Sequence, residues 1–278
     1  MQKKLFIIIA CLATLDIIAQ PYIDPINIRY TNAFRHNKNN ATPFSHLYIG
    51  SDLPFKTGRN SFIVLSPFYE KWNIDSASNK EYLPQASSIA IAVSAIFPLD
   101  NDHWSLTITA ISRFNSEGLN LDNSFQMGGL LLAGYKIHEN LKYKVGVYVN
   151  NEFFGLFVMP LAGIDWKIND RNNLFGTLPG RLTYEHKLSN NFYTGATFRA
   201  ITNSYRFNNG TYLRIEDNQL SAYLDCYATK HIVFTGEAGY GIFRKLRSGA
   251  AHNKIYLADY QWGDGMFIKL SAAYRVRL

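Results

Sequence analysis

The last thirteen residues alternate between apolar and mainly polar positions, and this pattern constrains the fold more than any other feature. Every second residue from Met266 to Leu278 is apolar, whereas the intervening positions include Lys269, Arg275 and Arg277. Successive side chains of a β-strand point to opposite faces, so a period of two predicts a strand with one long apolar face. Such a strand suits a membrane-spanning barrel, in which roughly 9–11 residues cross the hydrocarbon. A half-buried strand of a soluble β-sandwich would follow the same pattern.

The N-terminus favours the membrane barrel over the soluble sandwich. Two lysines precede an uncharged run from Leu5 to Leu15, and the small residue Ala19 follows. A short basic region, an apolar core and a small residue near a cleavage site are typical of a secretory signal peptide, which we predict at residues 1–19. The residues before Cys11 resemble a lipobox, but only six apolar residues precede this cysteine. We therefore interpret Cys11 as part of the signal core.

The remaining residues, 20–278, are predicted to form one β-barrel domain. No second apolar run reaches the roughly 20 residues that a transmembrane helix needs. Cys226 is the only cysteine after the signal, so no internal disulfide can form. The net charge is +7, but the cations are scattered singly rather than clustered. This distribution favours outer-membrane lipid and lipopolysaccharide as partners, and we expect no nucleic acid.

Alternating segments separated by polar stretches predict about twelve antiparallel strands, within a range of about ten to fourteen. The predicted strands lie near residues 27–34, 45–49, 61–70, 89–97, 104–110, 127–137, 141–149, 157–168, 174–178, 182–186, 192–200, 220–228, 232–242 and 266–278. The longer polar stretches are predicted to be loops, some with strand ends: 73–85, 114–126, 202–217 and 244–265.

Short turns alternate with these longer loops. The short turns are centred near Asn101, Glu139, Asp170, Asn190 and Lys230. Short turns on one rim and long loops on the other are characteristic of outer-membrane barrels. Trp104 and Trp166 lie a few residues from short turns, where an interfacial aromatic belt would place them.

Charged residues of the predicted strands lie opposite the apolar faces. Eight of them are predicted to face the lumen: Lys142, Lys144, Glu185, Arg199, Asp225, Glu237, Lys269 and Arg275. On the lipid side, a cation at the membrane centre would cost about 2–4 kcal/mol. Inside the barrel these residues could line an ion-selective channel, or pair with one another and fill a narrow lumen. The mixture of charges slightly favours the filled lumen.

We find no motif for catalysis, a cofactor or a metal. The seven histidines are dispersed and form no HExxH motif: His36, His46, His103, His138, His186, His231 and His252. There is no GxSxG or CxxC motif, and the Gly239–Gly241 segment lacks the third glycine and the helix of a nucleotide-binding fingerprint. Lipid-modifying barrel enzymes use a Ser/His pair on adjacent strands, and the sequence does not identify one. We therefore expect no cofactor, no metal and no enzymatic activity.

Four short motifs are similar to those of a known family. They are residues 161–170 (LAGIDWKIND), 178–180 (LPG), 204–206 (SYR) and 243–249 (FRKLRSG). They resemble DUF6268, a family of Bacteroidota outer-membrane β-barrels of unknown function, from about residue 61 to the C-terminus. The resemblance implies a barrel in the outer membrane of a Gram-negative cell, but no reaction. The terminal Leu278 replaces the phenylalanine most common there, which weakens the signal that the barrel-assembly machinery would read in this strand.

These observations lead us to expect a non-enzymatic outer-membrane barrel that is either structural or a channel for small solutes. A lipid-modifying barrel enzyme and a soluble exported barrel that binds a ligand remain the alternatives.

Overall fold

A computed structural model describes residues 21–34, 42–75, 85–99, 103–250, 255–260 and 262–278. The predicted signal peptide, His36 and His252 lie outside these residues. The described residues form an all-β structure, as the alternating pattern predicts. None of their segments is a helix long and apolar enough to cross a membrane.

The strands follow one another along the chain. They are β1 (Tyr22–Ala33), β2 (Phe44–Gly50), β3 (Leu53–Lys56), β4 (Phe62–Ile74), β5 (Ala86–Pro98), β6 (Trp104–Glu117), β7 (Phe125–His138), β8 (Leu141–Glu152), β9 (Gly155–Asn169), β10 (Asn172–Leu178), β11 (Arg181–Lys187), β12 (Phe192–Arg206), β13 (Thr211–Tyr227), β14 (Ile232–Ala250), β15 (Tyr256–Asp259) and β16 (Gly265–Arg277).

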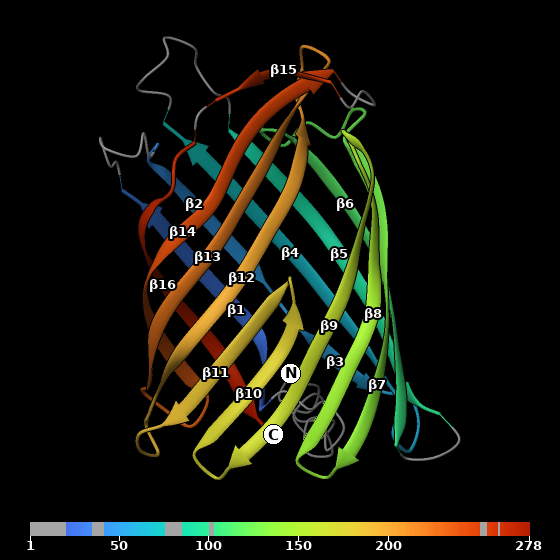
Figure 1. Cartoon of the computed structure of the whole chain (residues 1–278), viewed down its shortest axis with the longest axis vertical. Coiled ribbons are helices and arrows are strands. Elements are labelled where there is room, and N and C mark those ends of the chain that lie inside the picture. Colours follow the sequence, from blue (N-terminus) through green and yellow to red (C-terminus); the bar gives the residue numbers. More distant parts are fainter. Residues whose placement is uncertain (1–20, 35–41, 76–84, 100–102, 251–254, 261) are drawn as a thin grey trace, which may run out of the picture.

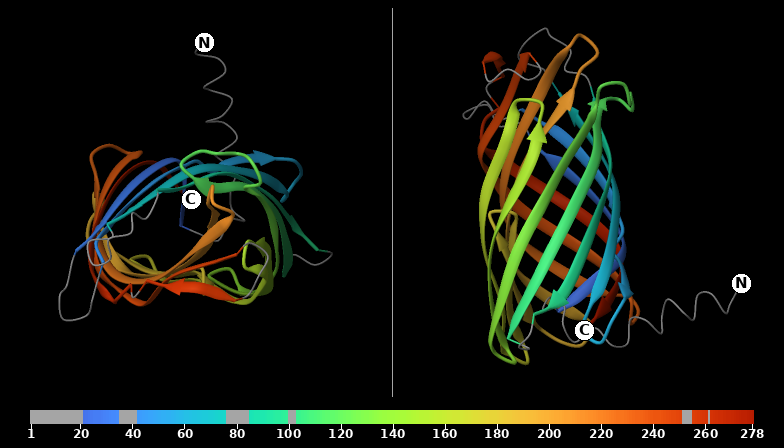
Figure 2. Two further views of the ribbon diagram at one scale, coloured as in Figure 1. Left: turned by 90° about the horizontal axis from the view of Figure 1, so that it is seen from above. Right: turned by 90° about the vertical axis from the view of Figure 1, so that its right-hand side faces the viewer.

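These strands close into an antiparallel barrel (Figures 1 and 2). Neighbours in sequence pair from β4 to β14, and β1 joins β2 to β16, which also pairs with β14. Two of the sixteen described strands add nothing to the ring: β3 continues the line of β2 along β4, and β15 extends the edge of β14. Fourteen strands therefore make up the wall.

The expected number of about twelve strands was therefore too low, although fourteen lies at the limit of the predicted range. Some strands are also much longer than the alternating pattern indicates. Most of the predicted loop 202–217 belongs to β12 and β13, and β14 continues to Ala250 within the predicted loop 244–265. At the loop-rim ends of β12 and β13 adjacent residues are both buried, as with Tyr212 and Leu213, so the alternation that identifies a strand is lost there.

Each strand end belongs to one of two rims. Turns after β7, β9, β11 and β13 are short and lie on the rim where the chain ends, which we call the short-turn rim (Figure 1). This confirms that the predicted turns near Glu139, Asp170, Asn190 and Lys230 share one rim, whereas Asn101 lies outside the described residues. The opposite rim, with most of the longer connections, is called the loop rim.

The outer surface is apolar and is bordered by aromatic pairs. Trp104 faces Tyr135 across β6 and β7 near the short-turn rim, and Phe114 faces Phe125 near the loop rim. All four side chains are exposed. Ten residues at about 3.3 Å per residue and a tilt of about 40° separate the pairs by roughly 25 Å along the axis. This matches the height of the apolar band on membrane barrels.

The loop-rim half of β12 and β13 folds into the ring instead of continuing its wall (Figure 2, left). Arg206 of β12 pairs with Ser116 of β6, a strand far from it in the ring. Residues from eight strands and from the β12–β13 and β15–β16 connections then pack in one cluster near the loop rim: Ala33, Phe44, Trp72, Ile74, Ala86, Tyr205, Phe207, Leu213, Ile215, Leu246, Trp262 and Phe267. This apolar cluster fills the loop-rim end of the lumen.

Candidate functional site in the barrel lumen

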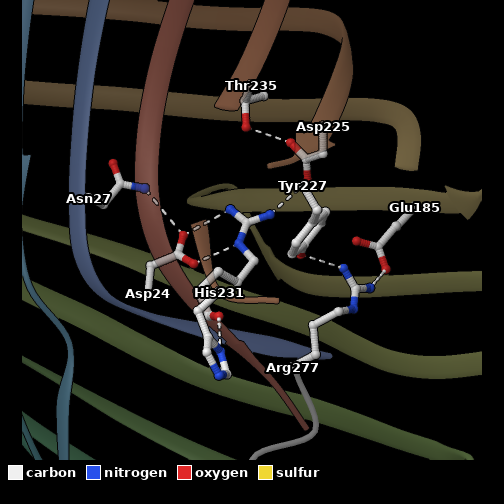
Figure 3. A network of polar contacts seen from close by, with 9 residues as sticks. Asp24, Asn27, Glu185, Asp225, Tyr227, His231, Thr235 and Arg277 are labelled. Carbon is white, nitrogen blue, oxygen red and sulfur yellow. Dashed lines mark hydrogen bonds and ion pairs between the residues drawn. The ribbon is translucent and has the colours of Figure 1, made fainter. Parts of the chain in front are cut away.

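The short-turn end of the lumen contains a buried ion-pair network centred on Arg275 of β16, whose partners Asp24 and Asp225 are labelled in Figure 3. Its Nε and Nη2 donate to the two carboxylate oxygens of Asp24 at 2.6 and 2.9 Å. Its Nη1 donates to Asp225 Oδ2 at 2.7 Å, and Thr235 donates to the other oxygen of Asp225. One guanidinium therefore connects β1, β16 and β13, and its charge is neutralised by two carboxylates.

A second set of contacts spans the lumen just beside this network. Arg277 of β16 donates to Glu185 of β11 and to the hydroxyl of Tyr227, which lies on β13. The rings of Tyr22 on β1 and Phe175 on β10 meet edge-on at 5.7 Å between centroids. Five strands separate β1 from β10 in the shorter direction around the ring. Side chains therefore bridge the barrel at this end.

The middle of the lumen carries an excess of positive charge. Lys269 of β16 pairs with Glu237 of β14 at 2.8 Å and donates to Gln219. Arg29 of β1 lies over the ring of Tyr48, with its guanidinium carbon 4.2 Å from the centroid. Two further arginines, Arg181 of β11 and Arg199 of β12, also face this region. Among the described residues, no carboxylate lies within ion-pair distance of any of these three arginines.

Glu70 of β4 organises the polar contacts nearer the loop rim. Its carboxylate accepts hydrogen bonds from the hydroxyl of Tyr205 at 2.7 Å and from Asn203 Nδ2 at 3.1 Å, both on β12. His46 Nε2 lies 3.2 Å from the other oxygen. Arg113 of β6 then joins Asn203 to Tyr148 of β8. These contacts connect opposite walls of the barrel through β12.

Glu152, at the end of β8, is the second anchor for β12. Its Oε2 accepts from the backbone N–H of Ser204 at 3.0 Å and from the Ser204 hydroxyl at 2.5 Å. Asn115 Nδ2 donates to the carbonyl of Ser204, and Gln126 donates to both Glu152 and the Ser204 hydroxyl. Buried backbone groups require hydrogen-bond partners. Side chains provide these partners along the edge of β12 that has no neighbouring strand.

The structure pairs six of the eight residues predicted to face the lumen. Arg275 contacts Asp225, Lys269 contacts Glu237, Lys144 contacts Asp165 at 2.6 Å, and Glu185 contacts Arg277. Lys142 and Arg199 have no ion pair among the described residues. Of these six paired residues, Glu185, Asp225, Lys269 and Arg275 are buried.

Sequence analysis missed several lumen residues. Arg29, Arg181 and Arg277 obey the same parity rule within their strands, so the rule could have identified them. Glu70, Arg113 and Glu152 lie near strand ends, where loops were expected or alternation is weak.

The contacts of the described serines and histidines bear on the lipid-modifying alternative. No hydrogen bond between described residues joins a serine hydroxyl to a histidine ring, and Glu70 of the His46–Glu70 pair already bonds to Tyr205. The His46 ring stacks on Trp72 at 3.8 Å between centroids. No three His, Cys, Asp or Glu side chains within the described residues are arranged to hold a metal ion.

The topology defines the class of the protein: a closed antiparallel β-barrel of fourteen strands with a polar, internally bridged lumen. Residues 31–274 match the family described as a domain of unknown function, DUF6268, and the chain belongs to this family. No curated protein matches the sequence.

Solved structures with a similar architecture are all distant in sequence. The NanC porin is 9% identical, with 90% of this chain and 100% of that chain covered and a TM-score of 0.44. A deletion mutant of TodX, described as a monoaromatic hydrocarbon channel, is 9% identical, with 98% and 94% covered and a TM-score of 0.36. The translocator domain of the autotransporter NalP from Neisseria meningitidis is 12% identical, with 99% and 95% covered and a TM-score of 0.31.

Proposed function

We propose that the chain is a non-enzymatic β-barrel of the outer membrane of Gram-negative bacteria such as Bacteroidota, with a lumen that side chains close near both rims. The observation that carries this proposal is the difference in residue type and exposure between the outer and inner faces of the wall. On β16, Met266, Ile268 and Leu270 are at least 43% exposed, whereas Lys269 and Arg275 are at most 6% exposed. Water would favour the opposite arrangement, and lipid favours this one.

The closed lumen supports a structural or selective role in preference to a wide pore. Arg277 and Glu185 bridge one end, Glu70 and Tyr205 bridge the other, and the apolar cluster lies beyond the second bridge. The ion pairs across the lumen support the second of the two arrangements expected from the sequence, in which side chains fill the barrel. Outer-membrane lipid, lipopolysaccharide and the barrel-assembly machinery, acting through β16, are the partners we propose.

Cell fractionation tests the membrane location. We expect the protein in the outer-membrane fraction, extractable only with detergent, and a folded form that migrates differently from the heated form in SDS gels. Recovery from the periplasm without detergent would instead support the soluble exported barrel.

Planar-bilayer recording tests the closed lumen. Purified protein should give no steady large conductance, because the bridges at both ends must open before ions can pass. A steady open channel would contradict the closed lumen but not the membrane location. A phospholipid hydrolysis assay, with Ser204→Ala as a control for the buried serine beside Glu152, addresses the enzyme alternative.

A further inference from the structure

The barrel wall is incomplete between β9 and β12. β10 pairs with β9 only from Ala162 onward, and β11 pairs with β12 only up to Arg199. Residues 155–161 of β9 and 200–206 of β12 therefore lack a neighbouring strand on the edges that face each other, apart from the Arg206 bridge to β6. Figure 1 shows the β10–β11 hairpin ending far below the loop rim. We call this interruption the lateral window.

The window has a defined frame. Below it, the backbone N–H of Ala200 donates to the carbonyls of Pro179 and Gly180 at the hairpin tip. Above it, the N–H of Phe153 donates to the Ser204 hydroxyl, and Phe154 contacts the Tyr212 ring. Pro160 lies within the unpaired part of β9, and proline is tolerated in a strand where its missing N–H faces no partner strand. The local sequence of β9 is therefore compatible with an unpaired edge at this position.

Two arginines lie directly below the window. The register places Gly163, Thr177, Arg181 and Arg199 in one row across β9, β10, β11 and β12. Arg181 and Arg199 are therefore opposite each other on adjacent strands, an arrangement that is unfavourable for like charges. The Nε of Arg199 is buried without an acceptor.

No carboxylate of the described residues forms an ion pair with these charges. Asp52 interacts with Arg181 only from beyond ion-pair distance, and it accepts a hydrogen bond from Ser66 at 2.6 Å. Arg29 adds a third positive charge to the same region. Glu237 faces this region too, but it already accepts from Lys269 at 2.8 Å and from Ser221 at 2.5 Å. The row thus lacks an anion.

The other side of the window is apolar. Phe157, Met159 and Leu161 share the inner parity of β9 with buried Asp165, whereas Leu156 and Val158 face outward and are more than half exposed. Leu161 lies two residues from Gly163, or about 7 Å along the strand from the arginine row. A molecule in the window would meet guanidinium groups at one end and an apolar wall along its length.

We propose that the lateral window binds a single-chain amphipathic carboxylate, such as a long-chain fatty acid, from the surrounding bilayer. Its carboxylate lies between Arg181 and Arg199, and its chain lies against Phe157, Met159 and Leu161. Guanidinium groups bind carboxylates with strong, directional hydrogen bonds. The inference rests on the proposed membrane location, because only a bilayer supplies such a molecule from the side.

Photocrosslinking tests this site. The barrel is first inserted into phosphatidylcholine nanodiscs, and insertion is verified by heat modifiability. A diazirine-bearing palmitate analogue is then crosslinked, and the labelled peptides are mapped. We expect labelling within residues 155–161 and 199–203, which excess palmitate abolishes and hexadecanol leaves unchanged. The double variant Arg181→Gln/Arg199→Gln should reduce this labelling at least tenfold, whereas the exposed control Arg171→Gln should not.

Several outcomes would overturn the inference while leaving the membrane location intact. These are an inserted barrel labelled only on its outer belt, equal labelling of the double variant, and equal competition by hexadecanol. Competition by inorganic phosphate as strong as that by palmitate would indicate a small-anion site and would also overturn it. If the double variant does not insert, the single variant Arg199→Gln provides the same comparison. Failure of the natural chain to insert contradicts the proposed membrane location instead.

Discussion

Glycine at position 195 allows β12 to lie close to its neighbouring strands β11 and β13. A Cβ added to Gly195 of β12 would lie 1.9 Å from the backbone carbonyl oxygen of Tyr184 and 3.0 Å from the Tyr223 ring. A Cβ added to Gly236 of β14 would meet nothing within 4 Å. Substitution by alanine therefore meets a crowded environment at Gly195 and an open one at Gly236.

Gly195→Ala should lower the free energy of unfolding by about 1–3 kcal/mol, because the backbone of β11 must move to admit the methyl group. Gly236→Ala should be neutral or raise it by up to about 1 kcal/mol, since it removes only the flexibility of glycine. Urea unfolding of the refolded barrel, followed by tryptophan fluorescence, measures both. Equal effects at the two positions would contradict the close packing at Gly195.

Arg275 is the residue on which charge balance at the short-turn end depends. Arg275→Met would leave Asp24 and Asp225 facing each other without a cation, and breaking a buried pair from one side costs about 3–5 kcal/mol. We expect a loss of that size in urea unfolding, and little change for Arg171→Met in the exposed β9–β10 turn. Adding Asp24→Asn and Asp225→Asn to Arg275→Met should restore part of the loss. No restoration would show that the arginine acts through packing alone.

At the scale of elements, β12 is unusual because half of it belongs to the wall and half crosses the lumen. Its free edge near Ser204 is satisfied by Glu152 and Asn115 and not by another strand. A hydrogen bond to a charged group contributes about 1.5–3 kcal/mol. The inward position of β12 therefore depends on a small number of side chains.

Glu152→Gln should loosen this segment selectively. The amide cannot replace the charge that holds the Ser204 N–H and hydroxyl, so the local opening free energy should fall by about 2 kcal/mol. Hydrogen exchange of residues 200–206 should accelerate about 30-fold, since each 1.36 kcal/mol corresponds to a factor of ten. Exchange in β5 and β6 should change little. Glu139→Gln, at the exposed Lys136–Glu139 pair, is the matched control.

The strands that could be predicted are those with one face toward the lumen and the other toward the outside of the barrel. β16 alternates throughout and β6 alternates from Trp104 to Ala110, because their outer residues meet lipid in our proposal and their inner residues meet the lumen. At the loop-rim end of β13 the adjacent residues Tyr212 and Leu213 are both buried, so the period of two is lost there. Its inclusion in a predicted loop follows from this loss of contrast.

Alternation along a strand also limits what can be predicted about the contacts in the lumen. Parity identified Arg199, Asp225 and Arg275 as inner residues, but it contains no information about partners across the ring. Asp24 lies within the bulge of β1 between Ile23 and Ile26, where parity shifts. The lateral window depends on the short length of β10 and β11, and the Pro179–Gly180 break was its only sign in the sequence.

For the whole molecule, the decisive property is the medium that surrounds the outer face. Leu131, in the middle of β7, is 47% exposed, and Leu121, in the turn between β6 and β7, is 55% exposed. In water, arginine would be tolerated equally well at both positions. In a bilayer the two differ, because Leu131 lies between the aromatic pairs and Leu121 lies beyond them.

Leu131→Arg should therefore lower the free energy of unfolding in lipid vesicles by about 2–4 kcal/mol, the range for a cation at the membrane centre. Leu121→Arg should change it by less than about 1 kcal/mol, because the loop rim is in contact with water. Urea titration of both variants in phosphatidylcholine vesicles measures this difference, and the natural chain provides the reference. If Leu131→Arg folds as stably as Leu121→Arg, the apolar band does not contact acyl chains, and the barrel would have to be assigned to an aqueous compartment or to a larger assembly that covers its wall.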